Sequence, residues 1–77
     1  MIEHYTNGNK YIGQKKGQIK HGKGKYEFKD GTYYDGQWFN NKINGVGNLY
    51  FKNGDLEYSG EWRNDEFNGW GTLYCQN

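Results

Sequence analysis

A motif of tyrosine, glycine and tryptophan recurs along this chain and restricts the folds that it can form. Units begin at Tyr11, Tyr34 and Tyr58, which are separated by 23 and 24 residues, and a glycine follows each tyrosine two positions later. A Gly-x-Gly pair comes 11 residues after each tyrosine, at Gly22-Lys23-Gly24, Gly45-Val46-Gly47 and Gly69-Trp70-Gly71. Self-similarity at this period is typical of repeat architectures, and the constant internal offset argues against chance.

Short polar segments separate these motifs and predict hairpin turns. Asp30-Gly31 and Asn53-Gly54 lie between units, and such pairs tolerate the positive φ values of tight hairpins. Residues 5–9 match the same segment, so the chain begins with the tail of a unit. Turns within units are predicted at Lys16-Gly17-Gln18, Asn40-Asn41-Lys42 and Asn64-Asp65-Glu66. Every element is therefore expected to be a short strand.

Alternation along the predicted strands gathers glycines and large side chains on one face, which we call the ring face. A glycine in a strand leaves room for a close neighbour, here expected to be a Tyr or Trp of the adjacent strand. The predicted ring face comprises Tyr11, Gly13, Gly22, Gly24, Tyr26, Phe28, Tyr34, Gly36, Trp38, Gly45, Gly47, Leu49, Phe51, Tyr58, Gly60, Trp62, Gly69, Gly71 and Leu73. The predicted fold is all-β, an antiparallel meander of successive β-hairpins in one twisted sheet.

These motifs resemble the MORN (membrane occupation and recognition nexus) repeat family, whose units read Tyr-x-Gly-x-Trp, a short turn, Gly-x-Gly and an Asp/Asn-Gly turn. The resemblance covers about residues 5–74 and divides a single unit, 1–77, into a partial repeat at 5–10 and repeats at 11–33, 34–57 and 58–77. It implies an elongated, grooved single sheet. It also implies a role in cytoskeletal, ciliary or membrane-contact assemblies, or beside catalytic domains that this sequence does not show.

Two departures from the repeat pattern point to irregular ends. Lys15 stands where the later units have Trp38 and Trp62, so a ring is missing from the first unit, which we expect to be weaker or capped by a partner. The third unit reaches Cys75-Gln76-Asn77 without its turn, which predicts an open sheet edge around residues 72–74. An open edge invites pairing with another chain, including a second copy in a homo-oligomer.

Composition indicates one small domain with few aliphatic residues. The 77 residues include 19% aromatic residues and 13 glycines, so apolar burial must come from rings, and we expect a partner or further repeats to add stability. The first residues lack the features of a signal peptide, and Cys75 is a lone cysteine. We therefore expect an intracellular protein, cytoplasmic, cytoskeletal or ciliary, or peripheral at a membrane. The high Asn and Lys content with a single Arg63 hints at a protist.

Little in the sequence indicates a catalytic, metal-binding or phosphate-binding site. Ser59, Cys75, His4 and His21 are the few candidate nucleophiles and bases, and they show no catalytic or metal-ligand spacing. Residues 17–24 nearly spell a phosphate-binding loop, but Gly24 replaces the required Ser/Thr and no helix is expected to follow. We predict no enzyme activity, no metal, no cofactor and no nucleic-acid partner.

Two sets of residues are candidates for binding. Alternation sends Phe39, Tyr50, Trp70 and Tyr74, with Val46, to the face opposite the rings, where they could anchor a protein partner or merely steady cross-strand pairs. Residues 1–33 have a net charge of +4 and residues 34–77 of −3. This asymmetry makes Lys15, Lys16, Lys20, Lys23 and Lys25 candidates for an acidic partner or an anionic phospholipid, or simply part of a solvated surface.

The sequence therefore predicts a non-enzymatic scaffold for protein–protein interaction, a small subunit of a larger assembly. The alternative is a peripheral phospholipid-binding module that uses the basic N-terminal half.

Overall fold

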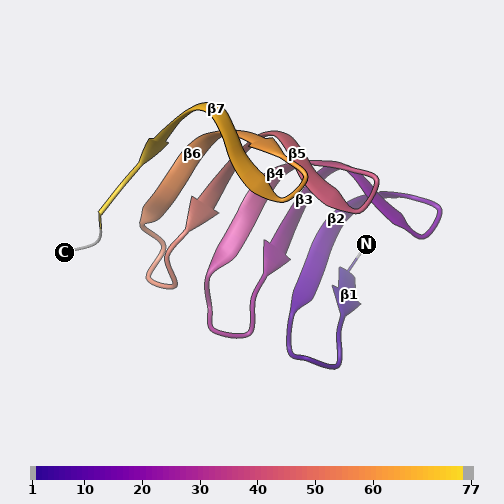
Figure 1. Ribbon diagram of the computed structural model, residues 1–77. Helices are drawn as coiled ribbons and strands as arrows, with labels where there is room; N and C mark the ends of the chain where they lie inside the picture. The colour runs from indigo at the N-terminus through magenta and orange to yellow at the C-terminus, as the bar shows by residue number, and fades with distance from the viewer. Residues whose placement is uncertain (1, 76–77) are drawn as a thin grey trace.

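The computed structural model describes residues 2–75 and consists of strands joined by turns, with no helix in that range. The strands are β1 (Ile2–His4), β2 (Lys10–Lys16), β3 (Ile19–Glu27), β4 (Tyr33–Phe39), β5 (Lys42–Tyr50), β6 (Leu56–Arg63) and β7 (Glu66–Leu73). They form one antiparallel sheet in sequence order, as Figure 1 shows. The prediction of an all-β hairpin meander is confirmed. The expected absence of a closing turn at Gln76 and Asn77 lies outside the described residues.

Each repeat forms one pair of strands in which two glycines lie opposite each other. The facing pairs are Gly13 and Gly24, Gly36 and Gly47, and Gly60 and Gly71. The register shifts directly after the first glycine of each pair, so every unit carries a β-bulge at the same place. Bulges bend strands and increase their twist. The strands accordingly arch over in Figure 1, and the sheet curves as a single layer.

Two kinds of turn connect the strands. Between units the turn is longer, and only its glycine has a left-handed backbone conformation. In the first of these turns between complete units, Gly31 has a φ of 98° and its N–H donates to the carbonyl of Phe28 at 3.0 Å. Within the later units the turn has two residues, both left-handed, with φ of 53° and 70° at Asn40 and Asn41. Asn and Asp tolerate this conformation better than other residues with side chains, which explains why they occur at these turns.

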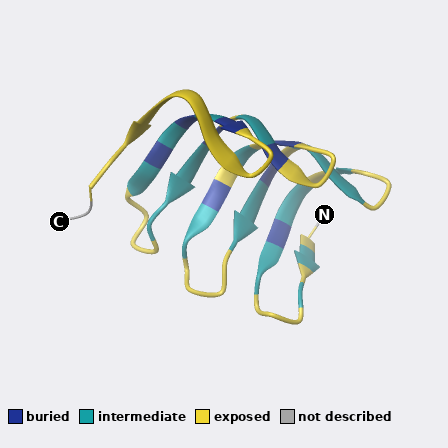
Figure 2. Ribbon diagram, viewed as in Figure 1, coloured by how far each residue is buried: buried dark blue, intermediate teal, exposed yellow. Residues whose placement is uncertain are grey.

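The buried residues line the ring face. The hydrophobic residues with less than a tenth of their surface exposed are Tyr11, Tyr34, Trp38, Ile43, Tyr58 and Trp62. Figure 2 shows them at intervals along the inner strands, while β7 is exposed along its whole length. Since no strand of residues 2–75 lies beyond β7, Leu73 is 64% exposed although it lies opposite Tyr58. Phe28 and Phe51 lie outside the strands, at the turns.

Candidate functional site

The repeated tyrosines fill the space above the glycines. The hydroxyl of Tyr34 donates to the carbonyl of Gln37 at 2.8 Å. A Cβ added at Gly47 would lie 2.5 Å from Cζ of Tyr34, so no larger residue fits under the ring. The same arrangement recurs at Tyr11 over Gly24 and at Tyr58 over Gly71. Burial raises the pKa of the Tyr34 phenol.

The tryptophans join each unit to the one before it. Trp38 Nε1 donates to the carbonyl of Gly24 at 3.0 Å, and Trp62 Nε1 donates to that of Gly47 at 3.1 Å. Each indole also meets tyrosine rings edge to face, Trp38 with Tyr34 at 5.5 Å and Trp62 with Tyr34 at 5.2 Å between centroids. Edge-to-face contacts and satisfied indole N–H groups hold these rings in fixed positions.

The first glycine of each Gly-x-Gly pair has a different structural role from the second. Gly22, Gly45 and Gly69 have positive φ values of 93°, 109° and 62° at the bulges. A Cβ there would meet the side chains of Gln14, Gln37 and Glu61 rather than a ring. Those side chains accept bonds from the N–H groups of Lys23, Val46 and Trp70 at 2.7, 2.8 and 3.2 Å. This role was not predicted from the sequence, although the recurrence of Gln, Gln and Glu at one repeat position could have indicated it.

A second set of contacts that the sequence reasoning missed clamps each turn onto the preceding unit. Asn41 accepts a bond from the N–H of Lys20 at 2.8 Å and donates its own N–H to the Lys20 carbonyl at 3.0 Å. Asp65 makes the same pair of bonds with Ile43, at 2.8 and 3.0 Å. Asn41 and Asp65 occupy the same position in their turns, and this recurrence in the sequence could have indicated the contacts with the preceding unit.

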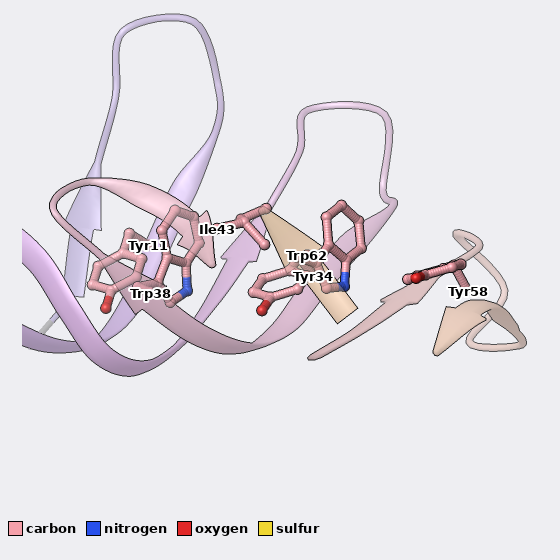
Figure 3. Close-up of a cluster of buried hydrophobic side chains, with 6 residues drawn as sticks. All are labelled: Tyr11, Tyr34, Trp38, Ile43, Tyr58 and Trp62. Atoms are coloured by element: carbon pink, nitrogen blue, oxygen red, sulfur yellow. The ribbon is translucent and has the colours of Figure 1, made fainter. Parts of the chain in front are cut away.

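The indole rings of Trp38 and Trp62 lie in the lining of a groove along the ring face. Its volume is about 530 Å³, and it extends from Lys20 and Tyr26 past Trp38, Ile43 and Trp62 to Phe67. Figure 3 shows the six buried side chains in a row, with Ile43 between the two indoles. The groove therefore spans all three units and is lined mainly by apolar side chains.

The repeat pattern matches a known family over almost the whole chain. The pattern of the MORN repeat matches residues 11–33, 34–56 and 58–77. The chain belongs to the MORN repeat family. The predicted resemblance to about three such repeats is confirmed.

A curated relative shares part of this MORN array. Phosphatidylinositol 4-phosphate 5-kinase 1 of Oryza sativa subsp. japonica is 46% identical over 41 residues. The match covers 53% of this chain and 5% of the rice protein. The likeness therefore concerns a short segment of a much longer protein.

The first MORN unit replaces its missing tryptophan with an ion pair. The Lys15 side chain is only 6% exposed, and its Nζ pairs with the carboxylate of Glu3 on β1. The Tyr5 hydroxyl donates to the same carboxylate at 2.7 Å. Hydrogen bonds from Lys15 and Tyr5 lower the pKa of Glu3. This end of the array is therefore capped by the chain's own β1, where we had expected a weaker end or a partner.

The five candidate lysines do not form one patch. Lys15 and Lys20 lie opposite each other on the ring face, whereas alternation places Lys16, Lys23 and Lys25 on the other face. Lys15 is buried and paired, and Lys25 Nζ lies 3.3 Å from Glu27. The charge asymmetry of the sequence is thus divided between two surfaces.

The aromatic residues opposite the rings are also dispersed. Phe39, Trp70 and Tyr74 are 54%, 62% and 42% exposed, but they belong to β4, to β7 and to the segment after β7. Tyr50 instead stacks on Tyr33 across the strands, with centroids 4.6 Å apart. The opposite face therefore offers separate aromatic side chains and a hollow of about 490 Å³ beside Lys23 and Phe39, whereas the groove of the ring face spans all three units.

Neither metal-binding groups nor a membrane-spanning helix occurs among the described residues. No set of three His, Cys, Asp or Glu side chains within residues 2–75 is placed to hold a metal ion. Over the same range, no helix is long and apolar enough to cross a bilayer.

Proposed function

We propose that this MORN array is a non-catalytic docking module that binds a segment of another polypeptide in the ring-face groove. The observation that carries the proposal is the groove itself, about 530 Å³ of mainly apolar surface across three units. Exposed apolar grooves of this kind are typical of recognition sites for peptides and amphipathic helices. The proposal assigns the chain to an intracellular assembly, cytoskeletal or adjacent to a membrane.

The groove is better suited to binding than the opposite face because its walls are fixed before a partner arrives. The indoles of Trp38 and Trp62 are held by hydrogen bonds to the preceding unit and by edge-to-face contacts. Binding to fixed rings costs little side-chain entropy. On the opposite face, Trp70 is 62% exposed on the edge strand, and its indole makes no aromatic contact with residues 2–75.

Two exposed aromatic residues on β7 allow a matched test. Phe67 lines the groove and is 46% exposed, whereas Trp70 lies three positions along the same strand on the other face. We expect Phe67→Glu to reduce capture of the native partner at least tenfold and Trp70→Glu to leave it unchanged, with the far-ultraviolet circular dichroism of both variants preserved. The reverse result would move the binding site to the opposite face.

The rice relative favours a second candidate function, binding to an anionic phospholipid. That protein is named for a phosphoinositide substrate, and Lys16 and Lys23 are exposed on one face of this chain. Co-sedimentation with vesicles containing phosphatidylinositol 4-phosphate, at low and high salt, tests this candidate. Salt-sensitive binding that is lost in Lys16→Gln/Lys23→Gln supports it, and no binding at low salt rejects it.

A further inference from the structure

We propose that the groove selects a polypeptide segment that carries an acidic side chain, which pairs with the ammonium of Lys20. This inference rests on the proposed function, because it specifies which segments the groove accepts. The rest of the segment is apolar and lies over the second and third units.

Rings hold the Lys20 ammonium at the N-terminal end of the groove. Its Nζ lies 5.3, 5.5, 5.7 and 5.8 Å from the ring centroids of Tyr5, Tyr11, Tyr26 and Trp38. A cation within about 6 Å of a ring centroid is attracted by the ring quadrupole. Four such rings fix the charge in one place, and Lys20 still lines the groove.

Lys20 forms no direct ion pair within residues 2–75, although its charge acts on the Glu3 carboxylate from a longer distance. No carboxylate of residues 2–75 lies within 4.0 Å of its Nζ, whereas the neighbouring Lys15 is paired with Glu3. The other charged side chain that lines the groove, Asp65, already accepts the N–H of Ile43 at 2.8 Å. The groove thus presents one fixed cation whose strongest available complement is an anion from outside.

The position of this cation sets the register of the bound segment. Lys20 lies opposite Lys15, and the corresponding places in the next two units hold Ile43, opposite Trp38, and Phe67, opposite Trp62. The groove therefore has a cation at one end and, apart from Asn41 and Asp65, an apolar lining along the rest. From β3 to β7 is four strand spacings, about 19 Å, which matches roughly 6 extended residues or 13 helical ones.

Two panels of synthetic peptides test the inference. One panel consists of 14-residue amphipathic helices with leucines on one face, and the other of 7-residue peptides that alternate leucine and serine. Each peptide carries Glu, Gln or Lys at its first or last position, and binding is measured by nuclear magnetic resonance on the full chain. The indole N–H signals of Trp38 and Trp62 report both binding and an intact fold.

We expect the best Glu peptide to bind the wild-type chain about tenfold more tightly than its Gln counterpart, as desolvated charge pairs allow. Lys20→Met keeps an unbranched stem among the rings and should reduce that ratio to about twofold or less, with binding of the Gln peptide retained. Lys23→Met, on the opposite face, is the matched control and should leave the ratio unchanged.

Each other outcome overturns part of the account. Equal affinity for Glu and Gln peptides, or a Glu preference that survives Lys20→Met, rejects selection by Lys20 but leaves groove binding intact. If no peptide of either panel shifts the groove signals, both the inference and the proposed function fail. Lys20-dependent binding of phosphatidylinositol 4-phosphate vesicles without peptide binding would assign the cation to a lipid headgroup and reject the inference.

Discussion

At the scale of single residues, the glycines and tyrosines of each unit form one packing device. The ring of Tyr34 lies against the bare backbone of Gly47, and its hydroxyl is held by the Gln37 carbonyl. The sequence predicted that a ring would cover glycine but not which ring. The structure assigns this place to tyrosine, because the indole of each later unit reaches back to the unit before it.

Gly47→Ala therefore tests packing rather than backbone freedom. A Cβ at Gly47 would meet the Tyr34 ring, and we expect a loss of about 3 kcal/mol in the free energy of unfolding. Gly54→Ala is the control, because Gly54 has a φ of 96° but open space around it, so only backbone strain of about 1 kcal/mol is expected. Urea unfolding measures both, and a smaller loss at Gly47 than at Gly54 would contradict this assignment.

The ion pair of Lys15 and Glu3 predicts a dependence of stability on pH. The pKa of Glu3 is lowered in the folded chain by hydrogen bonds from Lys15 and Tyr5. A lowered folded pKa stabilises the fold above the unfolded pKa of about 4.3, and this stability disappears as the pH falls through the folded pKa. We expect the wild-type chain to lose more stability on acidification than Glu3→Gln, by urea unfolding at a series of pH values. Identical dependence of stability on pH in the two chains would show that the ion pair does not contribute to the free energy of unfolding.

At the scale of elements, the turns make contacts that the repeat spacing and the alternation of side chains do not predict. The positions of the turns could be predicted from Asn, Asp and Gly, because these residues tolerate positive φ. Their clamping onto the preceding unit could not, because the bonds from Asn41 to Lys20 and from Asp65 to Ile43 join neighbouring units in space. Strand β1 was likewise unforeseen, since residues 2–4 show no repeat motif and pair with β2 through the backbone.

Substitutions of Asp65 can distinguish the hydrogen bond of its side chain to Ile43 from the effect of the left-handed backbone of the turn. Asp65 has a φ of 69°, and its carboxylate accepts the N–H of Ile43 at 2.8 Å. Asp65→Asn keeps a side-chain acceptor and tolerance of left-handed backbone, so we expect little change. Asp65→Ala should lose about 1–3 kcal/mol in the free energy of unfolding, through an unsatisfied backbone N–H and strain. Equal stability of the two variants would remove the clamp from the account.

At the scale of the whole molecule, the chain is a curved single-layer sheet with the short strand β1 at one edge and the fully exposed strand β7 at the other. The repeat spacing was sufficient to predict this architecture, because each unit forms one strand pair in sequence order. The division of the lysines between two faces could have been predicted from alternation across β3. The burial of the Lys15 side chain could not, because it depends on the ion pair with Glu3 on β1.

The exposed edge makes homo-oligomerisation by strand pairing a standing prediction. Strand β7 is exposed throughout, and Leu73 is 64% exposed. Light scattering over a range of concentrations should show association of the wild-type chain and a monomer for Leu73→Lys, since edge lysines oppose strand pairing. A wild-type chain that stays monomeric would count against pairing at this edge.

The most direct test of the central claim, that the ring-face groove holds a polypeptide, is photo-cross-linking in the native assembly. A benzophenone amino acid is placed at Phe67, inside the groove, or at Trp70, on the opposite face of the same strand. The account predicts that Phe67 cross-links to one defined peptide of a partner protein and that Trp70 does not. Cross-links from Trp70 alone, or from neither position, would contradict it.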